Sequence, residues 1–299
     1  MATMYFAKIN INEEIYEVYK HSEKVEEIFG KLLSKKWQEE TIVHTQGNKL
    51  NQDSDKEEVY KFINIDMVYD KGYLVGRLIE IFRDDLSLYD RNKDDINSIS
   101  QSELSRAIPF YFDWKNEIVA FIPSKKFSRK KFLVCFEELL NKIYGEQMFS
   151  VYLKNNIGDL KRAVNSFSKV SEIEITLVPP NSNKEEFDDL FPKSGDELEE
   201  TQGTKFYQKI SAPHSKTGLN VQASLFQRMI TGVAKGFGQF TALGKDSSGN
   251  TKRFSSDKSA PQRKYIKESS RNSFNEVIEY GRAGIIEILE EEIRRKSDD

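Results

Sequence analysis

The stretch IPFYFDWKNEIVAFIPSKKFSRKKFLVCFEELLNKIYGEQMFSVYL, residues 108–153, decides the fold class of this chain. Two apolar runs flank the polar turn at 113–116, which predicts a β-hairpin. Ser128 is a typical N-cap, and apolar residues then recur every three or four positions as far as Gly145, a typical helix stop. An apolar strand is expected at 149–153. The stretch therefore predicts a hairpin, a helix and a strand in close succession.

The flanking segments extend this pattern in both directions. A helix is predicted over 158–167, and residues 173–179 alternate apolar with polar side chains, as in a strand with one buried face. Near the start, residues 4–11 alternate in the same way before a single helix that Asn12 caps and that continues to Leu33. We therefore predict an α+β fold with mixed or antiparallel sheets packed with helices. A central ferredoxin-like split βαβ unit and a long C-terminal amphipathic helix are expected within it.

Polar segments predict the domain boundaries. Residues 83–101 are rich in Asp, Asn, Arg and Ser, a composition typical of a linker or a long surface excursion. Residues 183–203 are strongly acidic and are expected to form a loop or linker. We predict an N-terminal α+β domain over 1–100 and a ferredoxin-like α+β region over 105–182. A basic hairpin and the C-terminal helix then occupy 204–299.

Composition indicates a globular protein of the cytoplasm. The 299 residues are 38% hydrophobic and carry a net charge of −3. The single cysteine, Cys135, lies in an apolar run, so we expect a buried thiol and no internal disulfide. No apolar run approaches the roughly 20 residues that span a bilayer, and the first residues do not resemble a secretion signal.

Motifs for catalysis, metals and cofactors are not found in the sequence. The three histidines lie far apart from one another: His21, His44 and His214. No serine elbow is present, and the glycines after residue 231 follow a predicted helix, where a phosphate-binding loop would precede one. We therefore predict no catalytic residue, no metal ligand and no cofactor, and we expect the chain not to be an enzyme.

Positive charge is concentrated in two segments. Residues 205–267 contain twelve Lys or Arg residues against two Asp, a net charge of +10, and residues 125–131 add five cations where a helix begins. Aromatic residues interleave with these cations, which suits phosphate contact with occasional base stacking. The predicted nucleic-acid contacts are Lys125, Lys126, Arg129, Lys130, Lys131, Lys235, Lys245, Lys252, Arg253, Lys258, Arg263, Lys264 and Lys267.

Three segments carry a family resemblance. Residues 173–179 (IEITLVP), residues 243–249 (LGKDSSG) and Ser259-Ala260-Pro261 before the closing helix resemble the Rex-type phage exclusion DNA-binding protein and related bacterial phage-defence proteins. The resemblance covers mainly residues 110–299. It implies a dimeric, largely sequence-independent DNA binder that senses phage DNA or protein–DNA complexes. It also implies coupling to a membrane effector.

Together these observations predict a nucleic-acid-binding protein of a bacterial antiphage, abortive-infection or mobile-element system. DNA is the expected ligand, with RNA as the alternative, and a homodimer with a membrane effector or phage protein as partner is expected. Two other functions stay open. One is a divalent-metal nuclease, although Glu172 and Glu174 lie at a strand with no Glu-x-Lys in a matching strand to complete a metal site. The other is a protein-interaction module in which the acidic loop and the basic hairpin contact another protein.

Overall fold

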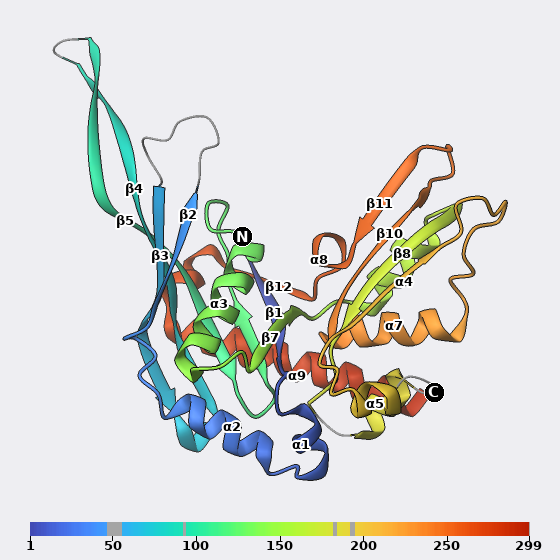
Figure 1. The fold of residues 1–299 in the computed structure, drawn as a ribbon. Coiled ribbons are helices and arrows are strands. Elements are labelled where there is room, and N and C mark those ends of the chain that lie inside the picture. Colours follow the sequence, from blue (N-terminus) through green and yellow to red (C-terminus); the bar gives the residue numbers. More distant parts are fainter. Residues whose placement is uncertain (47–55, 92–93, 182–183, 192–194, 299) are drawn as a thin grey trace.

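Two antiparallel β-sheets, each packed with helices, organise the computed structural model (Figure 1). The described residues are 1–46, 56–91, 94–181, 184–191 and 195–298. The larger sheet has the order β12–β1–β6–β5–β4–β3–β2, and β7 also pairs with β1. Its strands are β1 (Ala2–Ile11), β2 (Thr41–Gln46), β3 (Lys56–Val68), β4 (Tyr73–Asp90), β5 (Asp95–Asp113), β6 (Ile118–Phe121), β7 (Phe149–Leu153) and β12 (Arg263–Ile266).

The smaller sheet has the order β11–β10–β8–β9. Its strands are β8 (Lys169–Leu177), β9 (Phe206–Ser211), β10 (Gly238–Lys245) and β11 (Thr251–Ser255). The α-helices are α1 (Ile15–Lys20), α2 (Lys24–Leu33), α3 (Arg129–Tyr144), α4 (Ile157–Asn165), α5 (Lys184–Leu190), α6 (Gly195–Glu200), α7 (Ser224–Lys235), α8 (Ser256–Ser259) and α9 (Phe274–Asp298), with 3-10 turns η1 (Tyr69–Lys71) and η2 (Glu268–Asn272). The predicted α+β class and the long C-terminal helix are confirmed. Among the described residues, no helix combines the length and apolarity that crossing a membrane requires.

Helix α3 packs on the larger sheet through aromatic side chains. The Ser128 hydroxyl accepts a hydrogen bond from the Lys131 backbone N–H, and the helix ends at Gly145 with a left-handed φ of 98°. Phe132 stacks on Phe121 of β6 with ring centroids 4.0 Å apart. The predicted cap and stop are therefore confirmed, and the start of α3 is held at a fixed place on the sheet.

The predicted helix from Asn12 to Leu33 is instead two helices, α1 and α2. Asn12 does not cap α1, because its side-chain oxygen accepts a hydrogen bond from the Ser150 hydroxyl at 3.0 Å. The chain leaves helical geometry at His21 before α2 begins. Apolar residues recur every three or four positions on both sides of this break. Periodicity alone therefore did not predict that the helix is interrupted.

Two segments contain regular structure that their composition did not indicate: residues 83–101, expected to be a linker or a long surface excursion, and residues 183–203, expected to be a loop or linker. Within residues 83–101, β4 and β5 continue as one antiparallel hairpin that extends beyond the rest of the sheet in Figure 1. Within the acidic segment, α5 and α6 form, and α5 buries Phe187 and Leu190; residues 183 and 192–194 of that segment lie outside the described residues. Polar composition did not predict either structure. Backbone pairing between β4 and β5 orders the first segment, and the apolar face of α5 orders part of the second.

The strands of the expected ferredoxin-like unit are divided between the two sheets. β6 and β7 both pair with β1, whereas β8 belongs to the smaller sheet. The predicted boundary near residues 100–105 falls inside β5, which continues as far as Asp113. Local periodicity predicts strands well but does not specify which strand pairs with which.

Helix α9 lies against the opposite face of the larger sheet and approaches it closely at two glycines. A β-carbon at Gly281 would lie 2.8 Å from the Tyr111 ring, and one at Gly284 would lie 2.3 Å from the ring of Phe6. Both aromatic side chains are buried. The two glycines therefore set the distance between α9 and the sheet.

Replacing Gly284 with leucine should lower the free energy of unfolding by about 1–3 kcal/mol. The leucine side chain would clash with the buried Phe6 ring, which cannot move without disturbing the sheet. Urea denaturation of Gly284→Leu and of the control Arg282→Leu measures this effect. Arg282 is exposed on the same helix, so the control should change stability by less than about 0.5 kcal/mol. Equal losses in both variants would contradict the close approach.

Candidate nucleic-acid interface

A cavity of about 1020 Å³ lies between the start of α3 and the smaller sheet. Its lining comes from the first half of β1, the segment entering α3 with the first turn of that helix, the end of β7, the beginning of β10, the junction of β11 with α8, and η2. We call this cavity the basic cleft. Segments from the start, middle and end of the sequence meet there, so no single stretch of sequence could reveal it.

Five cations line the basic cleft, against the carboxylates of Asp257 and Glu268. The cations are Lys125, Arg129, Lys130, Lys258 and Arg271. The first four were predicted nucleic-acid contacts; the fifth was not, because it lies just beyond the basic segment that ends at residue 267. Its side chain is partly used by the protein, since it donates to the Pro123 carbonyl at 3.1 Å and pairs with Glu268.

Three lysines of the basic cleft are available to a ligand. Lys125, Lys130 and Lys258 are exposed, and none of them makes an ion pair with the part of the chain that the structure describes. Because α3 begins at Arg129, the positive end of its dipole adds to the potential of the same wall. An anion entering the cleft would therefore meet cations whose charge the protein has not already neutralised.

Arg129 connects the two walls of the basic cleft. Its guanidinium lies over the Tyr5 ring, 4.6 Å from the centroid, and donates to the backbone carbonyl of Asp257. A stacked guanidinium keeps N–H groups available for phosphate oxygens. The side chain thus fixes α3 against α8 and contributes positive charge to the cleft.

Asp257 brings a negative charge into the basic cleft, where burial disfavours the charged form of its carboxyl. Burial raises the pKa of this carboxyl above its usual value of 3.8, while a hydrogen bond from Ser256 and the charges of Arg129 and Lys130 act in the opposite direction. The burial effect is the largest of these. Protonation of Asp257 at acidic pH would make the cleft more positive.

Lys131 has a different role from its neighbour Lys130. Its ammonium group pairs with Glu80 and lies 2.8 Å from Glu58, and Arg106 reaches the other oxygen of Glu80 at 3.2 Å. The Glu80 side chain is fully buried. This predicted contact therefore fastens α3 to β3 and β4 and is not available to a polyanion.

Several other predicted contacts are also engaged within the protein. Lys235 pairs with Glu186, and Lys264 pairs with Glu287. Lys252 donates to the Ser166 hydroxyl and lies over the Phe167 ring. The remaining predicted contacts are exposed but do not line the basic cleft: Lys126, Lys245, Arg253, Arg263 and Lys267. The basic segment of the sequence therefore does not form one continuous basic surface.

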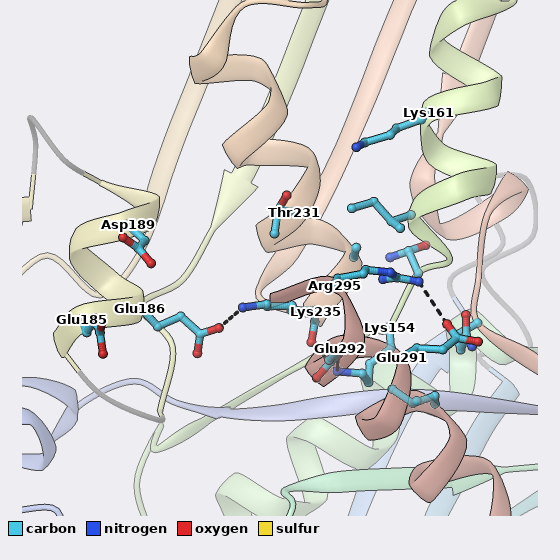
Figure 2. Close-up of a pocket in the computed structure, with 15 residues that line it drawn as sticks. Lys154, Lys161, Glu185, Glu186, Asp189, Thr231, Lys235, Glu291, Glu292 and Arg295 are labelled. Carbon is cyan, nitrogen blue, oxygen red and sulfur yellow. Dashed lines mark hydrogen bonds and ion pairs between the residues drawn. The ribbon is translucent and has the colours of Figure 1, made fainter. Parts of the chain in front are cut away.

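A second cavity, of about 660 Å³, is lined by charges that neutralise one another. Figure 2 shows Lys235 of α7 directed at Glu186 of α5, and Lys154 beside Glu292 of α9. The Lys154 ammonium is 2.7 Å from Glu292, and burial lowers the pKa of Lys154. This cavity therefore offers a polyanion much less free charge than the basic cleft does.

A metal site is not apparent within the described residues, where no three His, Cys, Asp or Glu side chains gather in a group that could hold an ion. Glu172 and Glu174, the carboxylates considered for a nuclease, both bind Lys209 at 2.9 Å. Cys135 is buried in α3, and burial raises the pKa of its thiol to about 12, as expected for a core residue.

A family model described as "Domain of unknown function (DUF4747)" matches residues 2–282, so the chain belongs to that family. No curated protein matches the chain.

Replacing Lys131 with methionine should lower the free energy of unfolding by roughly 3 kcal/mol, because Glu80 would stay buried with one of its two cations removed. Lys130→Met is the matched control and should change stability by less than about 0.5 kcal/mol. Chemical denaturation of both variants distinguishes the two roles. If both variants lose the same free energy of unfolding, Lys131 does not have this structural role.

Proposed function

We propose that this member of the DUF4747 family binds nucleic acid, with the sugar–phosphate backbone held in the basic cleft. One observation carries the proposal: cations from three separate segments converge on one cavity, and three of them are exposed lysines without an ion-pair partner in the described chain. Phosphates are the ligand groups that best match such a set of charges.

The cleft chemistry supports binding that depends little on sequence. Lysine ammonium groups contact phosphates as point charges and carry no information about bases, while Arg129 adds planar, bidentate donor geometry. DNA remains the ligand that we propose. The antiphage or mobile-element setting, the homodimer, and a membrane effector or phage protein as partner belong to the same proposal, and they rest on the family resemblance of residues 110–299.

The salt dependence of binding tests the cleft. Lys125, Lys130 and Lys258 should be replaced together by alanine, and a labelled oligonucleotide titrated by fluorescence anisotropy at several salt concentrations. The slope of log affinity against log salt should become shallower by roughly 2 to 3, because each lost phosphate contact removes about 0.7–0.9. Affinity at low salt should fall as well.

Lys35, Lys71 and Lys216, replaced together by alanine, provide the control for charge. These three lysines are also exposed and lie outside the cleft lining, so the slope should be unchanged. Equal effects of the two triple variants would show nonspecific attraction and refute the cleft assignment. Cleavage of the oligonucleotide that requires added magnesium would support the nuclease alternative instead.

Binding should also strengthen as the pH is lowered through the raised pKa of Asp257, because this carboxyl then loses its negative charge. Asp257→Asn should bind more tightly at pH 7 and show a flatter pH profile. Anisotropy titrations at a series of pH values measure both quantities. An unchanged profile in the variant would exclude Asp257 as the group responsible.

A further inference from the structure

The smaller sheet has one covered face and one open face. On the covered side, Phe226 of α7 meets Phe240 of β10 edge-on, with centroids 6.0 Å apart. Along β10, buried residues alternate with more accessible ones, and Gln239 is exposed on the opposite face. This opposite, open face presents polar side chains and one large aromatic ring to solvent.

The open face is continuous with the basic cleft. Gln239 of β10 and Ser255 of β11 lie on this face and also line the cleft. Gln239 pairs across the sheet with Thr176, which pairs in turn with Tyr207 of β9. Two strand spacings of about 4.8 Å place Tyr207 roughly 10 Å from Gln239. A chain held in the cleft can therefore reach Tyr207 within a few nucleotides.

The open face carries charges of both signs, and its two carboxylates are neutralised within the face. Glu172 and Glu174 are both bound by Lys209, while Arg253 of β11 and Lys245 of β10 are exposed on the same face. Tyr207, with 61% of its surface exposed, is the large aromatic side chain among them. An exposed aromatic ring with exposed cations beside it suits base stacking next to backbone contacts.

We propose that the basic cleft takes a single-stranded nucleic acid whose bases lie on the open face and stack on Tyr207. This inference rests on the proposed function and adds the class of ligand. Bases of a duplex are paired and stacked inside it, so an aromatic platform beside a phosphate-binding groove can be used only by unpaired bases. The aromatic ring of the open face and the cations of the cleft thus contact different parts of one strand.

The test compares a labelled single strand with the duplex of the same sequence in anisotropy titrations. The full-length chain should bind the single strand more tightly. Tyr207→Ala should weaken single-strand binding roughly fivefold to a hundredfold, the range for one lost base stack, and leave duplex binding unchanged. Tyr207→Phe keeps the ring and should stay within about twofold of the original affinity.

Two controls separate stacking from other effects. Tyr69 has the same exposed fraction but lies on η1, away from the cleft lining, so Tyr69→Ala should not change binding. An abasic strand of equal length should bind the original chain and Tyr207→Ala equally, because it offers nothing to stack. Melting temperatures of the variants confirm that each is folded.

Distinct outcomes overturn the two proposals. Equal affinity for single strand and duplex, or a loss at Tyr207→Ala that is the same for both ligands, refutes the single-strand inference while nucleic-acid binding stands. An absence of binding to either ligand at low salt refutes the proposed function, and the inference that rests on it fails too.

Discussion

The backbone pairing of β1 is the constraint on which the rest of the molecule depends. One edge of this strand pairs with β6 at residues 5–8. The other edge is divided between β12, at residues 2–5, and β7, at residues 7–11. Segments from the start, middle and end of the chain must therefore assemble on one strand. The basic cleft lies where the divided edge passes from β12 to β7, and Tyr5 and Leu153 line it there.

A buried amide with three hydrogen bonds helps to fix the smaller sheet to this strand. Asn181, which follows β8, accepts a hydrogen bond from the Ile11 N–H at 2.7 Å and donates to the Ile9 carbonyl at 2.8 Å. It also donates to Glu117, whose carboxylate is bound by Lys8. The two walls of the cleft are therefore held in register before any ligand arrives, which reduces the entropy that binding must overcome.

Local patterns in the sequence predicted those helices and hairpins whose start and stop signals lie within a few residues. Ser128 and Gly145 delimit α3 in the sequence and in the structure. The candidate site was predicted only in part. Lys130 and Lys131 are adjacent and chemically identical, yet only the second reaches the buried carboxylate of Glu80. The orientation of α3 on the larger sheet decides which of the two lysines points towards β3 and β4. Counting charges along the sequence cannot predict that orientation.

The bond from Arg129 to the Asp257 carbonyl joins walls that are 128 residues apart in the sequence. Such a site does not exist in the unfolded chain, where these segments are far from one another. A molecule that occupies the cleft therefore binds the folded state in preference to the unfolded chain, and by mass action it shifts the folding equilibrium towards the folded state. The resistance of this protein to heat or to proteolysis thus becomes a measure of how much ligand surrounds it.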